Sequence, residues 1–425
     1  MKEVMKRFFP MCMTVVFAVS GLVSAKESGN WTYWRGDDAN GVAMTSGTVR
    51  EFSEEKNMLW KVDLPGRGCS TPVVFGERIF VTSAIGSLDG VLCFDWTGKE
   101  LWRKAFGEET PLKHKTGGSG SNPSPLTDGG QVYVYYKSGT VAALTLEGKV
   151  VWKKNLQEKH GANVLSWDLG TSPILAGGYL VVTVMQSEGD SFLLALDKKT
   201  GEKVWKTKRN MDRAPVTGDA YSTPVVRSID GVETIVTWGA DFLTGHEAKS
   251  GKLLWTCGGF NEENKTRQRV VASVVTSGEM ALLTGSRGVY LAGVKLGEEK
   301  ISWKRPKSGS DMATPVAHDG HFYVLIDRGK DRGTVRCLDR TTGEPIWETV
   351  FQRSPSIYYS SPLLVGEDLY CAREDGVVFC GRVGEKGLEE VVENRLEDTL
   401  VASPVAVNGK LLIRGHEHLY CFGKE

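Results

Sequence analysis

The 425-residue sequence lacks an excess of charge of either sign. It contains 52 Lys and Arg residues and 52 Asp and Glu residues. Proteins that bind nucleic acid or an anionic membrane surface through their net charge carry a clear basic excess. The balance therefore excludes recognition driven by overall charge, and we expect no nucleic-acid partner.

The eight cysteines lack any spacing typical of a cofactor or metal site. There is no Cys-x-x-Cys, no Cys-x-x-Cys-His and no adjacent cysteine pair, which excludes attached haem and paired zinc ligands. Seven cysteines remain after residue 25, so at least one thiol stays unpaired. Cys371 and Cys380 flank a predicted hairpin turn, where either a disulfide or two core thiols would fit.

Catalytic and metal-binding motifs are also lacking. The sequence has no Gly-x-Ser-x-Gly, His-Glu-x-x-His or phosphate-binding loop. The histidine pairs at 318/321 and 416/418 have no acidic or thiol partner at metal-binding spacing. The run Asp37-Asp38-Asn40 lacks the remaining ligands of a calcium loop. We therefore predict neither a metal site nor a catalytic residue from motifs.

The longest apolar stretch lies at the N-terminus. Residues 8–23 follow a basic start of Lys2, Lys6 and Arg7, and small residues lead to a cleavage site after Ala25. Pro10 interrupts the stretch, which makes it a poor membrane span. We predict a signal peptide over 1–25, a periplasmic or secreted protein, and no transmembrane segment in the mature chain. An uncleaved anchor is the alternative.

Glycine and regularly spaced tryptophan are abundant. Seven of the 12 tryptophans recur 42 to 53 residues apart, at positions 60, 102, 152, 205, 255, 303 and 347. Five of these have a glycine four residues earlier, at positions 98, 148, 201, 251 and 343. A polar turn such as Asp197–Gly201 and an apolar run such as Phe192–Leu196 precede the tryptophan. This pattern predicts a strand, a tight turn and a second strand.

A second mark, Ser or Thr followed by Pro and two apolar residues, recurs out of phase with the first. It begins at Thr71, Ser124, Ser172, Thr223, Thr314, Ser361 and Ser403. Ala272-Ser273-Val274 fills an eighth position without its proline. A proline that starts a strand costs no ladder hydrogen bond. A glycine turn and another strand, such as Gln131–Tyr135, then follow.

Eight units of four strands predict an all-β, eight-bladed propeller of antiparallel blades over residues 57–425, after a separate segment at 26–56. The last unit, 403–422, ends after three strands, whereas Trp60 precedes the first Ser-Pro mark. We therefore predict that the N-terminal strand around Trp60 completes the last blade and closes the ring. The seventh unit ends in Leu388–Val392 without a tryptophan and is the weakest repeat.

Ala-Leu-Asp-x-x-Thr-Gly-x-x-x-Trp at 195–205 resembles the repeat of quinoprotein-type, or PQQ-like, propellers. The chain is also similar to the propeller of the outer-membrane barrel-assembly lipoprotein, and to exported propellers that begin with Trp-x-x-Trp-Arg-Gly, here Trp31–Gly36. In the family's enzymes the resemblance implies pyrroloquinoline quinone (PQQ) with Ca²⁺, a stacking Trp, a catalytic Asp and an adjacent cysteine pair. Since this chain lacks that pair and a lipid-attachment motif, no cofactor is predicted; PQQ with calcium is the alternative, without support from individual residues.

Long connections between blades indicate where function lies. In a four-stranded blade, the crossovers to the next blade share one face of the disc, and here they cover about 103–121, 153–170, 206–220 and 256–270. Residues just before each innermost strand converge on the axis. We predict a ligand-binding set on this face that consists of Asn122, Trp167, Asp168, Asp219, Tyr221, Arg269, Asp311 and Tyr359. The alternative is that these side chains are solvated or bond to neighbouring loops.

Three functions remain open from the sequence. The first is a monomeric, exported, non-catalytic scaffold that binds a protein or a small extracellular ligand on its long-loop face. The second is a quinoprotein-like oxidoreductase with a degenerate cofactor site. The feature that favours this hypothesis is Trp167 beside Asp168 on the predicted axial face. The third is a hydrolytic or lyase propeller that uses axial His, Arg and Tyr side chains.

Overall fold

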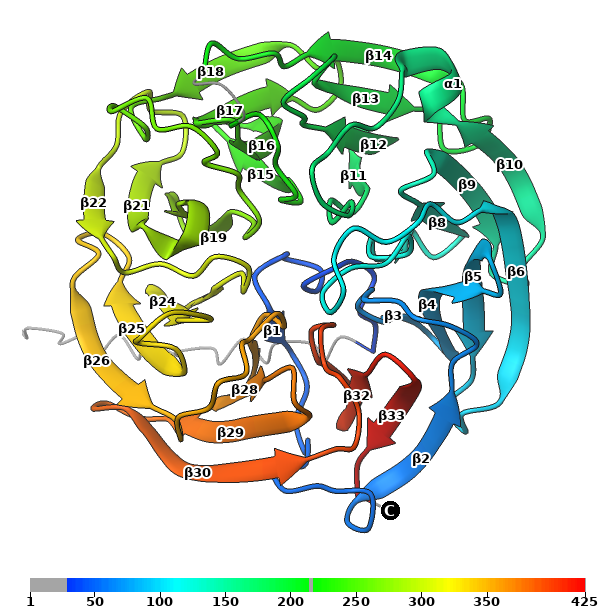
Figure 1. Ribbon diagram of the computed structural model, residues 1–425, viewed down its shortest axis with the longest axis vertical. Helices are drawn as coiled ribbons and strands as arrows, with labels where there is room; N and C mark the ends of the chain where they lie inside the picture. Colours follow the sequence, from blue (N-terminus) through cyan, green and yellow to red (C-terminus); the bar gives the residue numbers. More distant parts are fainter. Residues whose placement is uncertain (1–28, 214–216, 425) are drawn as a thin grey trace, which may run out of the picture.

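A computed structural model describes residues 29–213 and 217–424, so the predicted signal peptide at 1–25 lies outside the described residues. Eight sheets stand around a central axis like the blades of a propeller (Figure 1). Seven sheets have four strands and one has five. The predicted all-β, eight-bladed fold with antiparallel blades is confirmed.

The first four blades follow the chain in order. The four strands of each blade are called A to D from the axis outward, so strand A is innermost. Blade 1 consists of β3 (Val73–Phe75), β4 (Arg78–Ile85), β5 (Leu88–Phe94) and β6 (Glu100–Glu108). Blade 2 consists of β7 (Leu126–Thr127), β8 (Gln131–Tyr135), β9 (Thr140–Thr145) and β10 (Val150–Asn155). Blade 3 consists of β11 (Ile174–Ala176), β12 (Tyr179–Val184), β13 (Phe192–Leu196) and β14 (Lys203–Lys208). Blade 4 consists of β15 (Val225–Ile229), β16 (Val232–Gly239), β17 (Phe242–Glu247) and β18 (Leu253–Cys257).

The other four blades complete the ring. Blade 5 consists of β19 (Val275–Ser277), β20 (Met280–Thr284), β21 (Tyr290–Lys295) and β22 (Trp303–Pro306). Blade 6 consists of β23 (Val316–His318), β24 (His321–Leu325), β25 (Thr334–Asp339) and β26 (Pro345–Val350). Blade 7 consists of β27 (Leu363–Val365), β28 (Asp368–Ala372), β29 (Val377–Val383) and β30 (Leu388–Arg395), with β1 (Val42–Ala43) added. Blade 8 consists of β31 (Val405–Val407), β32 (Lys410–Arg414), β33 (His418–Phe422) and β2 (Met58–Asp63).

The N-terminal segment closes the ring, as predicted. Strand β2 pairs antiparallel with β33, with Lys61 opposite Tyr420. The parallel pairing of β1 with the innermost strand of blade 7, where Val42 faces Leu364, was not predicted. Because β2 is bonded to the last strand of the chain, the first and last segments share one sheet and leave no open edge at the closure.

Each repeated glycine receives the tryptophan of the preceding blade. A Cβ on Gly201 would lie 2.6 Å from the Trp152 ring, and the Trp152 indole N–H donates to the carbonyl oxygen of Lys198 at 2.8 Å. The other pairs of this kind are Trp60–Gly98, Trp102–Gly148, Trp205–Gly251 and Trp303–Gly343. The fixed spacing therefore reflects contact between blades, because only glycine leaves room for the ring at a positive φ.

The Ser or Thr before each strand A forms a hydrogen-bonded chain around the axis. The Thr223 hydroxyl accepts the backbone N–H of Ser172 at 3.0 Å, and the Ser273 hydroxyl accepts that of Thr223 at 2.8 Å. The same bond joins Thr71 to Ser124, Ser124 to Ser172, Ser273 to Thr314, Thr314 to Ser361, and Ser361 to Ser403. We call these eight residues the hydroxyl ring. Ser273 keeps its place although its proline is missing.

The N-terminal segment crosses the axis beside the inner strands. Arg35, only 1% exposed, donates to the carbonyl oxygens of Pro362 at 2.5 Å and Pro315 at 2.9 Å. Tyr33 donates to the carbonyl of Pro224 at 2.8 Å, and Trp31 exchanges backbone bonds with Val74. Burial without an acidic partner lowers the pKa of Arg35 to about 9. The segment thereby joins blades 1, 4, 6 and 7 across the axis (Figure 1).

The strand register decides between the two alternatives for Cys371 and Cys380. Cys371 lies opposite Phe379, and Cys380 lies opposite Tyr370, so the two thiols lie on opposite faces of the sheet. The described cysteines are all free, and the disulfide alternative is wrong. Cys93, Cys337 and Cys421 are likewise buried free thiols.

The crossovers begin later than predicted, because the outer strands β6 and β14 run on to Glu108 and Lys208. Two short helical turns, α1 (Leu156–His160) and η1 (Ser286–Gly288), lie in the connections and were not expected. None of the described helices is long and apolar enough to cross a membrane.

The contact between tryptophan and glycine can be tested with two glycines that both have positive φ. At Gly201 (φ +68°) a Cβ would meet Trp152, whereas at Gly231 (φ +79°) nothing lies within 4 Å. Gly231→Ala should therefore cost only the backbone strain, about 1–2 kcal/mol, and Gly201→Ala about 1–3 kcal/mol more through displaced packing. Urea unfolding measures both, and equal losses would contradict this packing.

The hydroxyl ring predicts a difference between two substitutions at one position. Thr223→Val keeps the shape of the side chain but leaves the Ser172 N–H without its acceptor, which should cost about 1–3 kcal/mol in the free energy of unfolding. Thr223→Ser keeps the oxygen and should cost clearly less. A valine variant as stable as the serine variant would show that the ring adds nothing to stability.

Candidate functional site

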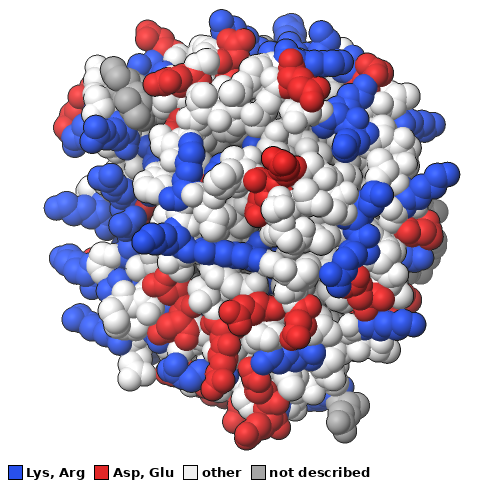
Figure 2. All heavy atoms as spheres, turned by 45° about the vertical axis from the view of Figure 1, so that its right-hand side comes forward, with Lys and Arg blue, Asp and Glu red and all other residues white. Residues whose placement is uncertain are grey.

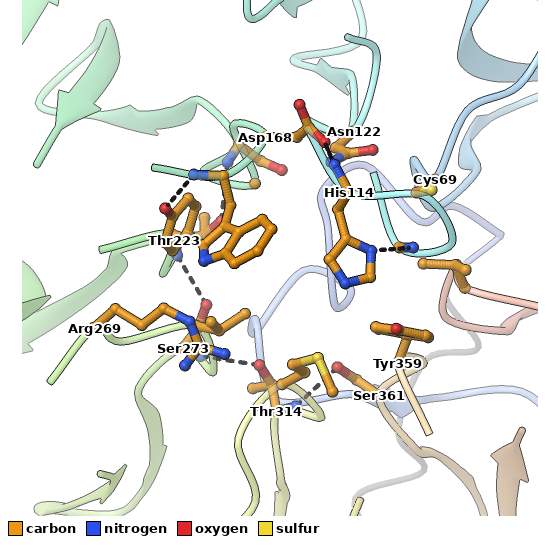
Figure 3. A pocket seen from close by; sticks show the side chains of 18 of the residues that line it. Cys69, His114, Asn122, Asp168, Thr223, Arg269, Ser273, Thr314, Tyr359 and Ser361 are labelled. Carbon is orange, nitrogen blue, oxygen red and sulfur yellow. Dashed lines mark hydrogen bonds between the residues drawn. The ribbon is translucent and has the colours of Figure 1, made fainter. Parts of the chain in front are cut away.

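A cavity of about 740 Å³ lies on the axis at the crossover face (Figure 3). All eight members of the hydroxyl ring line it, and Trp34 from the N-terminal segment lines it as well. Its size falls within the range of small-molecule pockets, about 300–1,000 Å³. The crossovers and the loops between strands B and C supply the remaining walls.

The structure brings the predicted binding residues together. Seven of the eight line this cavity, namely Asn122, Trp167, Asp168, Asp219, Tyr221, Arg269 and Tyr359. Asp311 does not line it but bonds to Arg269, which does. The convergence of these crossovers on the axis is a structural finding, whereas ligand binding by these residues stays a prediction.

Asp168 holds the crossover that precedes it in the chain. Its carboxylate accepts the backbone N–H groups of Lys113 at 3.0 Å and His114 at 2.9 Å. The ammonium group of Lys137 lies 2.5 Å away, and both side chains are at most 6% exposed. Three donors therefore occupy the carboxylate, whose direct effect is to position the loop that carries His114.

Asp219 has the same role in the next blade. Its oxygens accept the N–H groups of Ser166 at 2.9 Å and Ser187 at 2.7 Å, while the Tyr221 hydroxyl oxygen accepts that of Trp167 at 2.9 Å. Burial raises the pKa of Tyr221, so the phenol stays protonated. These bonds place Trp167 at the cavity with 44% of its surface exposed.

Three rings form an aromatic wall. The His114 ring stands edge-on to Trp167, with centroids 5.5 Å apart, and edge-on to Tyr359, with centroids 5.8 Å apart. The Nδ1 atom of His114 accepts the backbone N–H of Gly117 at 2.9 Å. The neutral imidazole therefore carries its proton on Nε2, which makes that nitrogen a donor.

Asp311 joins three loops that carry arginines. It accepts two bonds from Arg269 at 2.8 and 2.9 Å, one from Arg328 at 2.7 Å, and the backbone N–H of Arg287 at 2.7 Å. Burial alone would raise the pKa of Asp311, but the hydrogen bonds and charge of Arg269 hold it below its usual value. The carboxylate is fully covered and stays ionised.

The arginine side of the cavity has spare positive charge. Arg267 and Arg287 are exposed and line the cavity, and no described residue bonds to their guanidinium groups. With Arg269 and Arg328 they place four cations beside two buried carboxylates, those of Asp311 and Asp327. Figure 2, by contrast, shows basic and acidic side chains spread together over the visible surface. The excess in the cavity is therefore local.

Several residues of the site lie outside the predicted set. Lys137, Arg287 and Arg328 come from loops between strands B and C, and Asp327 lies beside Arg328. Each of the three basic residues follows the end of its strand B by two or three positions, at the same face as the crossovers. A basic residue that recurs at this position after strand B could have been recognised in the sequence as part of the site. Trp34 had no such signal, because its segment belongs to no repeat.

Asp327 is a buried support of the site. It accepts the backbone N–H groups of Asp311, Met312 and Ala313, and burial raises its pKa to about 6. It thereby shapes the turn that presents Asp311 to the arginines.

The thiol nearest the cavity is not activated. The Sγ atom of Cys69 lies 3.8 Å from Nε2 of His416. Burial raises the pKa of Cys69 to about 11 and lowers that of His416 to about 4. Both groups are neutral near pH 7, whereas a nucleophilic cysteine requires a thiolate.

Repeat, blade order and axial cavity define an eight-bladed propeller of the PQQ-like class. The chain belongs to the family described as outer membrane protein assembly factor BamB, whose model matches residues 36–166, 88–349 and 299–387.

Two curated proteins illustrate the relationship. An outer membrane protein assembly factor BamB of Burkholderia pseudomallei is 25% identical over 58% of this chain and 60% of its own length. A polyvinylalcohol dehydrogenase of a Pseudomonas species is 23% identical over 68% of this chain and 46% of its own length. The chain thus spans about half to three fifths of these relatives.

Solved structures agree on the fold. BamB from Moraxella catarrhalis superposes with a TM-score of 0.60 at 16% identity, over 86% of this chain and 99% of that one. The quinohemoprotein alcohol dehydrogenase of Comamonas testosteroni superposes with a TM-score of 0.68 at 14% identity, over 95% and 82%. At these identities the likeness shows the fold alone.

The residues at the cavity do not fit a calcium-bound quinone. Calcium requires six to eight oxygen ligands, but the carboxylates of Asp168, Asp219 and Asp311 already accept bonds from loops and cations. The described residues contain no group of three or more His, Cys, Asp or Glu side chains able to hold a metal. We therefore derive no chemical step through this cofactor.

The role of Asp311 can be tested by its neutral analogue. Asp311→Asn leaves Arg269 and Arg328 without their shared charge and should lower the free energy of unfolding by about 3 kcal/mol. Because the folded pKa lies below 3.8, the difference from wild type should be full above about pH 5 and shrink as the pH falls below 3.8.

Chemical denaturation across pH 3–7 measures this difference. The exposed Asp212→Asn should change the stability by less than about 0.5 kcal/mol and serves as the control. A difference that grows at acid pH would contradict the ion-pair role of Asp311.

Proposed function

We propose that this protein is an exported, non-catalytic propeller scaffold that binds a ligand on its crossover face. One observation carries the proposal: loops from successive blades converge on one cavity, and its carboxylates are occupied in holding those loops. The aromatic and cationic side chains Trp167, Arg267 and Arg287 remain accessible there. This is the composition of a binding site.

The polar groups of the cavity support a role without catalysis. Asp168 and Asp219 each accept at least two N–H bonds, so neither is an available base. The Nε2 atom of His114 carries its proton, and Cys69 is a neutral thiol. General acid–base catalysis requires a group that can take up a proton within reach of the substrate.

The finer points of this proposal extend the family relationship. We propose a periplasmic or secreted monomer whose ligand is a protein or a small extracellular molecule. The name of the family, an assembly factor, favours a protein partner. The cavity favours a small molecule, because about 740 Å³ on the axis suits a ligand of that size better than a folded surface.

A quinoprotein-like oxidoreductase is the second candidate. It is favoured by the relationship to a polyvinylalcohol dehydrogenase and by two indole rings, Trp34 and Trp167, at one cavity. Titration with PQQ and Ca²⁺, followed by fluorescence and melting temperature, tests it, because a ligand of the native state raises apparent stability. A saturable shift that needs both components would support the enzyme, and no shift would count against it.

Site-specific photo-cross-linking tests the proposed binding face. Benzoylphenylalanine in place of Trp167 should give defined adducts in cell envelopes, since 44% of Trp167 is exposed. The same group in place of Trp96, a half-buried tryptophan in the turn between β5 and β6, serves as the control away from the crossover face. Adducts from position 96 alone, or equal sets from both positions, would contradict binding at the crossover face.

A further inference from the structure

The floor of the cavity presents hydrogen-bond donors. Seven hydroxyl oxygens of the ring, from Ser124 to Ser403, each accept a backbone N–H. No described residue accepts a bond from the hydrogen of any of these hydroxyls. All seven residues line the cavity and are at most 6% exposed. A hydroxyl whose oxygen is already used still has one hydrogen to donate, so the ring calls for a ligand rich in acceptor oxygens.

The walls add charge and a second type of donor. The guanidinium groups of Arg267 and Arg287 have no partner among the described residues, and the Nε2–H of His114 faces the same space. Guanidinium groups bind carboxylate, sulfate and phosphate with two parallel bonds. A ligand that matches these groups therefore carries an oxyanion as well as neutral acceptors.

The aromatic wall supplies the apolar contact. Figure 3 shows Arg269 on one side of the cavity and His114 and Tyr359 across from it. Trp167 offers a partly exposed indole beside His114. Tryptophan buries a large apolar area while its edge stays polar, which suits the C–H face of a sugar ring.

We propose that the cavity binds an acidic saccharide, with its carboxylate or sulfate held by Arg267 and Arg287, its hydroxyl oxygens on the hydroxyl ring and its ring against Trp167. This inference rests on the proposed binding face and names the ligand class. A flat aromatic acid would leave most of the seven donors unmatched. An acidic peptide offers carbonyl acceptors but also backbone N–H groups, which find no acceptor among the ring hydroxyls whose oxygens are already used, and unpaired polar groups in a covered site weaken binding.

Calorimetric titration of the full mature chain tests the class. The probes are D-glucuronate, D-galacturonate and D-glucose 6-sulfate, with D-glucose and D-galactose as neutral counterparts. At least one acidic sugar should bind with a dissociation constant of about 1 mM or tighter, and its neutral counterpart at least about tenfold more weakly, because the neutral sugar cannot form the charge-assisted bonds to the arginines. Added salt should weaken the acidic sugar alone.

Three variants locate the site. Arg267→Gln and Arg287→Gln should each weaken the acidic sugar about tenfold and leave the neutral sugar unchanged. Arg353→Gln is the control, since Arg353 is an exposed arginine of a crossover outside the cavity. All three positions are exposed, so the fold should survive, and unchanged melting temperatures check this.

The outcomes separate this inference from the proposed function. Equal binding of acidic and neutral sugars, an equal loss in Arg353→Gln, or no binding of any of the five sugars would overturn the acidic-saccharide proposal. Cross-links from position 167 together with no sugar binding would keep the scaffold and reject the saccharide. Failure of the cross-links with tight, arginine-dependent sugar binding would reject a protein partner only.

Discussion

The hydrogen bond from the backbone of one blade to the hydroxyl of the next is the interaction on which the ring depends most. Strand A is the innermost of the four repeated strands in every blade, and the backbone N–H before it points to no strand of its own sheet. The Ser or Thr of the following blade accepts that N–H, as Thr223 does for Ser172. An unpaired buried N–H costs about 1–3 kcal/mol, so these bonds stabilise seven of the eight junctions between neighbouring blades, from blade 1 through blade 8.

The contact between tryptophan and glycine at the outer end of the blades also joins neighbouring blades. Trp152 of one blade rests on Gly201 of the next and bonds to the carbonyl of Lys198. A single four-stranded sheet cannot cover both of its faces. The hydroxyl bond joins seven pairs of neighbouring sheets at their inner ends, and the tryptophan–glycine contact joins five pairs at their outer ends. Buried aspartates also join neighbouring blades at the crossover face, because Asp168 and Asp219 each accept N–H groups of a preceding connection. The cavity is thus a product of contacts between blades.

The sequence predicted what repeats. The two recurring marks predicted eight blades, the closing strand around Trp60 and the face on which Trp167, Arg269 and Tyr359 meet. It could not predict Trp34 at the cavity or Arg35 across the axis, because their segment occurs once and its place depends on carbonyl groups of several blades.

The sequence also could not predict which groups individual side chains contact. Asp168, Asp219 and Asp311 were expected to face a ligand, yet their oxygens are taken up by neighbouring loops, a distinction that spacing does not carry. The suggested bond between Cys371 and Cys380 failed for a related reason. A shift of one residue in register moves a side chain to the other face of the sheet.

Contacts between blades build a donor-rich, cationic cavity on the axis, and the central claim is that an acidic sugar binds there. A crystal structure of the protein grown with the tightest-binding acidic sugar tests it most directly. The sugar's oxyanion should lie within hydrogen-bond distance of Arg267 or Arg287, with its ring against Trp167 and its hydroxyl oxygens on Ser and Thr residues of the ring. Sugar density elsewhere on the surface, with the axial cavity holding water alone, would contradict the claim.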